Sequence, residues 1–206
     1  EPPDAIPAGA GRLRVADAIE RESNDPWLIS VSASSQFLPM YEGLVRFDTE
    51  AKFVPMLATS WEFSSDLKTW TFNLRKGVQW QRGFGEFTTA DVVHSIERHI
   101  RPDSVSSDAR FWREQVIDNI EVVDDYQISY HLKVPKLDIP EISITHRAFY
   151  LLSKAHFDAE GQEGILESPV GTGPYQYVER ASGAHVLYER VPYDHWRVNP
   201  HFPELQ

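Results

Sequence analysis

The stretch that decides the fold is TWTFNLRKG, residues 69–77. Its apolar residues Trp70, Phe72 and Leu74 alternate with polar ones, so they fall on one side of an extended chain. This alternation predicts a β-strand with one buried face, which stops at a basic pair and a glycine. A second strand is expected over 61–63, because the polar turn SSDLK separates it from the first. The segment therefore predicts an antiparallel hairpin.

Further strands are expected on both sides of this hairpin. The alternation in 118–133, broken by two aspartates, predicts a second hairpin, and the segment 175–188 predicts a third around an Ala-Ser-Gly turn. A short strand is expected at 13–16, and strand pieces at 45–47 and at Phe53. Short antiparallel strands with few helices predict an α+β (mixed α/β) domain built from hairpins.

Two helices are expected. The first opens at Thr88, a residue that caps free amides, and carries apolar residues at helical spacing until Pro102 ends it. The second is a short helix over 153–161, with Ser153 as its N-cap and Gly161 at its end.

Composition excludes several classes of protein. The chain has 206 residues and a formal net charge of −11, so it would repel nucleic-acid phosphates. It has no cysteine, which rules out disulfides and thiolate metal sites. No apolar run is long enough to span a membrane. Residues 1–12 read as a disordered lead-in without a signal pattern, so any targeting peptide is expected to have been removed already or never to have been present.

Several segments, in order along the chain, resemble one family, the family 5 extracellular solute-binding proteins of ABC importers. This group includes dipeptide-, oligopeptide- and nickel-binding proteins. The resemblance runs from about residue 13 to residue 200. The segments are YEGLVRFD (41–48), PMLATSWEFSSDLKTWTFNLRKGVQW (55–80), FTTADVVHSIER (87–98), IEVVDDYQISYHL (120–132), SPVGTGPYQYVE (168–179) and PYDHW (192–196).

The resemblance implies a type II periplasmic-binding-protein lobe with two subdomains. Residues 13–48 and 168–206 would form the first subdomain, and 49–167 would be inserted as the second. Family members are longer and carry a second lobe that closes on the ligand, so this chain resembles the N-terminal lobe only.

The implied function is the substrate-binding component of an importer, periplasmic or on the cell surface. It would capture a peptide or another small polar solute and deliver it to a membrane permease, without a cofactor. A ligand-sensing regulatory module built on the same lobe is the alternative.

The first candidate ligand-binding residues lie after strand ends and in a glycine turn. Glu20, Arg21, Glu22 and Ser23 follow the first expected strand, where α/β binding proteins place ligand contacts; a solvated charged face is the alternative. Tyr41 belongs to the first family segment. Gly171, Thr172 and Gly173 form a turn that either borders the ligand cleft or joins two subdomains structurally.

Aromatic and basic residues supply the remaining candidates. Trp80 and Arg82 would stack on a ligand and pair with its carboxylate, or Trp80 would pack under the helix that opens at Thr88. Arg110, Phe111, Trp112 and Arg113 would lie near the ligand or form a surface turn. His146 and Arg147 would face the cleft or solvent.

Catalysis and metal binding are not expected. The acidic doublet at 124–125 sits in a hairpin turn, where neighbouring carboxylates point apart, and no serine lies in a Gly-x-Ser-x-Gly context. The histidines do not follow metal-ligand spacing.

Overall fold

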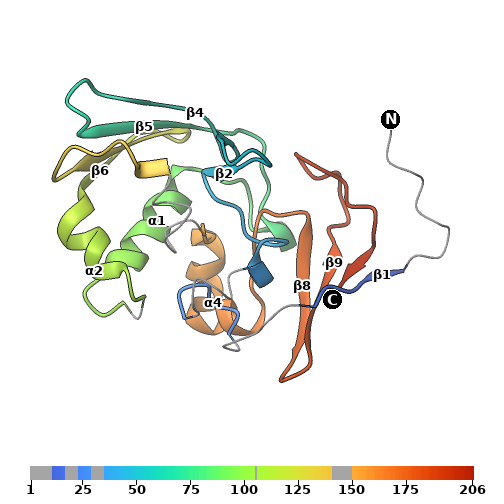
Figure 1. The fold of residues 1–206 in the computed structure, drawn as a ribbon. Coiled ribbons are helices and arrows are strands. Elements are labelled where there is room, and N and C mark those ends of the chain that lie inside the picture. Colours follow the sequence, from blue (N-terminus) through green and yellow to red (C-terminus); the bar gives the residue numbers. More distant parts are fainter. Residues whose placement is uncertain (1–10, 17–22, 29–34, 105, 141–149) are drawn as a thin grey trace, which may run out of the picture.

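The computed structural model describes residues 11–16, 23–28, 35–104, 106–140 and 150–206. Two four-stranded sheets lie at opposite ends of the molecule, and helices fill the space between them (Figure 1). A third, two-stranded sheet joins β2 (Val45–Phe47) to β3 (Phe53–Pro55). Candidates that fall at 17–22 and 141–149 lie outside the described residues.

The first large sheet confirms the two hairpins predicted in the middle of the chain. Its strand order is β4-β5-β7-β6, and every neighbouring pair is antiparallel. The apolar face of β5 is buried, because Trp70, Phe72 and Leu74 are each at most 4 % exposed. The strands are β4 (Ala58–Phe63), β5 (Thr69–Leu74), β6 (Ile117–Asp124) and β7 (Gln127–Leu132).

The helix predicted after Thr88 is α1 (Thr89–Ile100). Its first turn is closed reciprocally: Thr88 Oγ1 accepts from the Ala90 amide at 3.3 Å, and Asp91 Oδ2 accepts from the Thr88 amide at 2.9 Å. Val92 and Ile96 are buried in the cluster that also contains the apolar face of β5. This helix therefore covers one face of the sheet.

The second large sheet joins the beginning of the chain to its last described residues. Its order is β1-β10-β9-β8, with β1 parallel to β10 and the other pairs antiparallel. The predicted third hairpin is confirmed, but the first strand covers only two residues rather than 13–16. The strands are β1 (Arg12–Leu13), β8 (Tyr175–Ala181), β9 (His185–Arg190) and β10 (Glu204–Leu205).

The remaining helical segments are α4 (Lys154–Glu167), α2 (Ala109–Phe111), the π-helical turn η3 (Trp112–Val116) and the 3₁₀ turn η2 (Gln81–Gly83). Ser153 caps α4 as predicted, accepting from the His156 amide at 3.1 Å. Gly161 interrupts the helix with φ of +64°, a value that glycine adopts without strain, but a further helical stretch follows to Glu167. That stretch was not predicted.

The apolar core has two clusters. One contains the buried faces of β5 and β7 with α1, and the other packs Phe37, Met40 and Tyr41 against Tyr177 and Tyr188 of the second sheet. The strands of the first large sheet all fall within 49–167, the predicted second subdomain. Those of the second large sheet fall within 13–48 and 168–206, apart from Arg12 at the start of β1. The third sheet pairs β2, before the predicted boundary at residue 48, with β3, after it. The division into two subdomains stays a prediction.

Candidate functional site

The family-like segments meet in one buried polar cluster, which we call the junction: Glu42, Gln81, Thr172, His195, Trp196 and Arg197. The carboxylate of Glu42 has 0 % exposure and lies at its centre. Its Oε2 accepts from Thr172 Oγ1 and from Trp196 Nε1, each at 3.0 Å. Its Oε1 accepts from Nε of Arg197 at 3.2 Å and from Nη2 at 3.0 Å. A buried carboxylate is thus satisfied by two neutral donors and one guanidinium.

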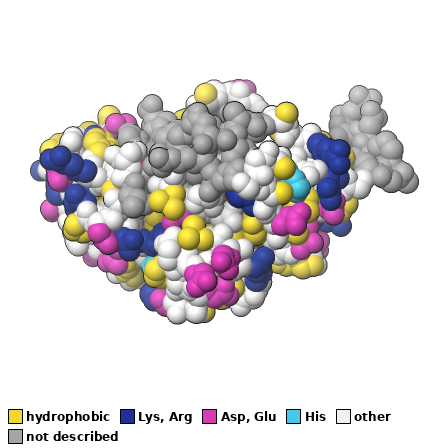
Figure 2. All heavy atoms as spheres, turned by 90° about the horizontal axis from the view of Figure 1, so that it is seen from below, with side chains coloured by type: hydrophobic (Ala, Val, Ile, Leu, Met, Phe, Trp, Pro, Cys, Tyr) yellow, Lys and Arg dark blue, Asp and Glu magenta, His cyan; other side chains and the backbone are white. Residues whose placement is uncertain are grey.

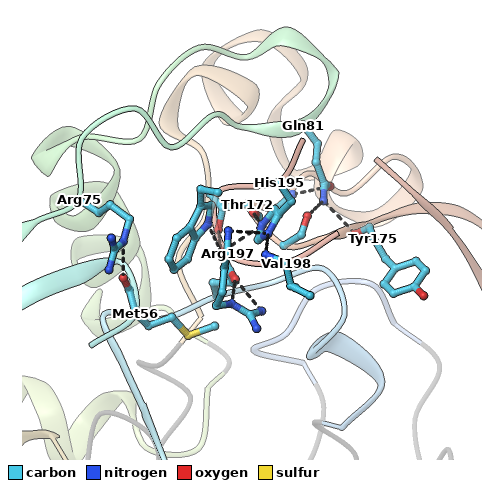
Figure 3. A network of polar contacts seen from close by, with 12 residues as sticks. Met56, Arg75, Gln81, Thr172, Tyr175, His195, Arg197 and Val198 are labelled. Carbon is cyan, nitrogen blue, oxygen red and sulfur yellow. Dashed lines mark hydrogen bonds and ion pairs between the residues drawn. The ribbon is translucent and has the colours of Figure 1, made fainter. Parts of the chain in front are cut away.

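His195 holds the last family segment in place (Figure 3). Its Nε2 donates to the Thr172 carbonyl at 2.8 Å, and its Nδ1 accepts from the amides of Arg197 and Val198, each at 3.3 Å. These partners fix the neutral tautomer with the proton on Nε2. Burial lowers the pKa of His195, because the charged imidazolium is poorly solvated there.

Arg75, from the end of the fold-deciding strand, reaches the same junction. Its guanidinium lies 4.4 Å from the centroid of the Trp196 ring, and its Nε donates to the Met56 carbonyl at 3.0 Å (Figure 3). TWTFNLRKG therefore contributes a strand to the first large sheet. Its Arg75 also contacts the segment that connects β9 to β10 of the second large sheet.

The glycine turn at 171–173 permits close backbone approach. A Cβ on Gly171 would lie 2.0 Å from the Met40 carbonyl oxygen, and one on Gly173 would lie 2.5 Å from that of Pro39. The buried side chain of Gln81 crosses to this turn: its Nε2 donates to Gly173 O at 2.9 Å, and its Oε1 accepts from the Gly171 amide at 3.1 Å. The glycines are therefore needed for packing of the turn against residues 39–40.

A hollow of about 900 Å³ lies beside the junction. Its walls come from residues 14–16 after β1, the turn 35–39, and strands β9 and β10. Apolar side chains such as Val15, Leu38 and Leu205 line it together with polar Arg14 and Gln36. Apolar walls with a few polar groups are typical of small-molecule sites.

Strands β8 and β9 hold one wall of this hollow in place. Pro39 lines the hollow, and its carbonyl accepts from the Tyr175 amide at 3.1 Å, next to the packed Gly173. At the other end of the same turn, the Tyr188 hydroxyl donates to the Gln36 carbonyl at 2.6 Å. The turn that forms the wall is thus held by β8, within the family-like segment 168–179, and by β9.

Several predicted site residues are buried at or near the junction. Gly171, Thr172 and Gly173 are buried in the turn that contacts Gln81, Glu42 and residues 39–40. Tyr41 is 1 % exposed, packs against the rings of Phe37 and Tyr150, and its hydroxyl has no hydrogen-bond partner among the described residues. Burial raises the pKa of Tyr41 well above its ordinary value.

The candidates Trp80 and Arg82 lie in and next to the turn η2, which also contains Gln81. Trp80 packs in the core, and its Nε1 donates to Asp91 Oδ2 at 3.1 Å, an arrangement that matches the packing alternative. Arg82 is exposed and donates to the Tyr177 carbonyl at 3.0 Å.

The candidates at 110–113, in α2 and η3, lie far from the hollow, at the opposite end of the molecule from the second large sheet (Figure 1). Arg110 is exposed and pairs with Glu114 at 2.8 Å. Arg113 donates to the carbonyls of Ile100 and Arg101 at the end of α1, Trp112 is buried, and Phe111 is half-buried. The structure does not bring this segment together with the glycine turn.

The other candidates lie at the edge of the described residues or beyond it. The Ser23 carbonyl accepts from Arg180 at 3.1 Å. Glu20, Arg21, Glu22, His146 and Arg147 lie outside the described residues.

Sequence reasoning missed the charged and polar centre of the junction, namely Glu42, Gln81, His195 and Arg197. Glu42 and His195 belong to segments that carried the family resemblance, and Gln81 and Arg197 directly follow such segments. Their position in or next to the family-like segments is the sequence feature that could have identified them.

Acidic side chains gather on the outer surface of the molecule. Figure 2 shows them in a group on the face seen from below, where α4 lies, and Asp158, Glu160, Glu163 and Glu167 of that helix are exposed. Among the described residues, no group of histidine, aspartate and glutamate has metal-binding geometry. No helix in the described part of the chain is long and apolar enough to cross a membrane.

Comparison with protein families matches residues 52–206 to the model described as "Bacterial extracellular solute-binding proteins, family 5 Middle". The glutathione-binding protein GsiB of Pectobacterium atrosepticum is 36% identical over 138 residues, which are 67% of this chain and 26% of that protein. The di/tripeptide-binding protein 2 of Pseudomonas aeruginosa is 29% identical and covers 98% of this chain and 41% of its own length.

The fold is also found in solved structures. The binding protein MoaA of A. tumefaciens, in complex with mannopinic acid, superposes with a TM-score of 0.83 at 26% identity, over 95% of this chain and 40% of that one. The mixed α/β periplasmic-binding fold expected from the sequence is thereby confirmed. The chain spans well under half the length of these relatives.

Proposed function

Because the chain belongs to the family 5 bacterial extracellular solute-binding proteins, we propose that it acts in the substrate-binding component of an ABC importer. The observation that carries this proposal is the hollow, because the family-like segment 168–179 helps to hold the turn that forms one of its walls. The proposed location is the periplasm or the cell surface, and the proposed partner is a membrane permease. The relatives are binding proteins rather than enzymes, so the component captures its solute unchanged.

The proposed solute is a peptide or another small polar molecule. Two relatives are described as binding glutathione and di- or tripeptides, and a solved neighbour is in complex with mannopinic acid. The hollow suits such molecules, since Val15, Leu38 and Leu205 offer apolar contact while Arg14 and Gln36 offer polar groups. Preformed walls lower the entropy cost of binding, because less of the protein must be ordered by the ligand.

Titration calorimetry tests this function. The purified chain is titrated with trialanine, glutathione and mannopinic acid, and at least one of them is expected to bind with a saturable heat signal. Substitution Leu38→Asp places a charge in the hollow and is expected to weaken that binding at least about tenfold, the cost of one misplaced polar contact.

A matched control is available on the same chain. Leu137 is 61% exposed and Leu38 is 53% exposed, but Leu137 does not line the hollow. Leu137→Asp should therefore bind as the unchanged chain does. Absence of binding by all three solutes, or equal loss in both variants, would reject the hollow as the site.

A further inference from the structure

The side chain of Arg180, in β8, is a half-buried cation whose hydrogen-bond acceptors among the described residues are all neutral oxygens. Its Nε and Nη2 donate to Asn24 Oδ1 at 3.0 and 2.9 Å, and Nη2 also donates to the Ser23 carbonyl at 3.1 Å. The last acceptor is Gln36 Oε1, 2.9 Å from Nη2. Nη1 is shielded from solvent and has no hydrogen-bond partner among the described residues.

Two described acidic residues adjoin Arg180 or its partner Asn24 in the sequence, and both have other partners. Asp25 accepts from Arg98 Nη2 at 3.0 Å and from the Trp27 amide at 2.9 Å. Glu179, the preceding residue, lies 3.3 Å from His185 Nε2. The Tyr188 phenol stays protonated, because burial raises its pKa and its hydroxyl donates to the Gln36 carbonyl. In a chain with 31 acidic residues, this guanidinium has no ion pair among the described residues.

Arg180 lies next to two residues that line the hollow. It pairs across the strands with Val186, so the two side chains stand on the same face of the sheet, and Val186 lines the hollow. Gln36, which covers Nη2, lines the hollow as well. A molecule in the hollow therefore reaches Arg180 by replacing a single amide oxygen.

We propose that Arg180 is an anion-recognition group of the hollow and takes a carboxylate of the bound solute. A carboxylate that replaces Gln36 Oε1 bridges Nη2 and the unpartnered Nη1 in the two-point geometry that guanidinium favours. It also supplies the missing negative charge, and a half-buried cation gains most from such a partner. This inference deepens the proposed function and rests on it for the identity of the solute as an importer's cargo.

The first experiment needs no knowledge of the natural solute. Arginine Nε–Hε signals of ¹⁵N-arginine-labelled protein are followed by NMR while sodium acetate replaces sodium chloride at constant ionic strength. Arg180→Lys assigns the Arg180 signal. Arg190 is the internal reference, since it lies on the adjacent strand and the one side-chain hydrogen bond that it makes with described residues runs from Nη1 to the Pro200 carbonyl, at 3.2 Å.

The Arg180 signal is expected to shift saturably, with an apparent Kd at least about tenfold lower than that of Arg190, the margin of one charge-assisted hydrogen bond. A signal that moves no further than that of Arg190 would overturn the proposal. In that event Arg180 only clamps residues 23–24 and 36 to β8.

The second experiment separates this inference from the proposed function. Trialanine and its C-terminal amide are titrated into the unchanged chain and into Arg180→Lys. The free acid should lose about tenfold or more in affinity in the variant and the amide less than about threefold, because only the acid presents the carboxylate. Equal losses for acid and amide would reject Arg180 as the carboxylate partner, whereas acetate binding without peptide binding would support the anion group and reject the peptide function.

Discussion

At the scale of single residues, the buried Glu42 carboxylate is expected to be the most sensitive position of the junction. Glu42→Gln keeps the shape but replaces an acceptor of several hydrogen bonds by an amide and leaves Arg197 without its ion pair. Because Arg197 is 32% exposed and solvent compensates part of its charge, we expect a loss of about 2 kcal/mol in the free energy of unfolding. Urea denaturation followed by circular dichroism measures it.

Glu50→Gln is the control for this substitution. Glu50 pairs with Lys52 at 2.6 Å, but both side chains are about 70% exposed, at 69% and 71%. Its removal should change the unfolding free energy by less than about 0.5 kcal/mol. Equal effects of the two substitutions would show that the junction contributes nothing beyond a surface ion pair.

His195 gives the molecule a dependence of stability on pH. Its folded-state pKa is lowered by burial, so below the ordinary histidine value of about 6.5 the unfolded chain binds the proton more readily. The stabilisation is therefore present above about pH 6.5 and is lost as the pH falls toward the lower folded-state pKa. His195→Asn keeps an acceptor for the amides of Arg197 and Val198 but cannot take up the proton.

The measurement is the urea midpoint at several pH values between 5 and 8. We expect the unchanged chain to lose more stability than His195→Asn between about pH 6.5 and 5, since the variant lacks this titration. The informative quantity is the difference between the two proteins in the slope of urea midpoint against pH. The slope of one protein alone would also contain the titration of His94 and His156, whose pKa values burial lowers as well. Identical slopes would refute a contribution from His195.

At the scale of elements, Asp91 links two helix N-termini. Its Oδ2 accepts from the Thr88 amide and Trp80 Nε1, and its Oδ1 accepts from the Lys154 amide at 2.8 Å, at the start of α4. Asp91→Asn turns one acceptor into a donor that faces other donors, so we expect a loss of about 2 kcal/mol. Thr88→Ser retains the capping hydroxyl and is expected to stay within about 0.5 kcal/mol. Chemical denaturation of both variants checks this, and a harmless Asp91→Asn would contradict the linking role.

Elements that local pattern determines were predictable, whereas contacts between distant segments were not. The alternation in 69–74 identified β5, and the cap at Thr88 identified α1 within a residue. The predicted helix end at Gly161 was wrong: the glycine only kinks α4, and the stretch beyond it buries Ile165 in the second cluster, a contact that local sequence does not reveal. Likewise, Glu42 and Arg197 are 155 residues apart, and no periodicity pairs them.

At the scale of the whole molecule, polar bridges connect the two core clusters. Arg98 of α1 donates to Asp25, and Gln162 of α4 donates to the same oxygen of Asp25 at 2.9 Å. The second bridge is Gln81, which carries three buried side-chain hydrogen bonds to the turn that begins β8: to Gly173 O, to Tyr175 O and from the Gly171 amide. Since Gln81 ties the second sheet to the rest of the chain, its loss should affect that sheet first.

Gln81→Met keeps the volume of the side chain and leaves these three partners unsatisfied in a buried place, at an expected cost of about 3 kcal/mol. Amide hydrogen exchange is the appropriate measurement, because it reports the opening of each sheet separately. In the unchanged chain, amides of β8–β9 and of β5–β7 should share one protection level. In the variant, β8–β9 should lose protection by more than β5–β7, while Gln115→Met, at an exposed position, should change neither. A uniform loss across both sheets would mean that Gln81 acts only through overall stability.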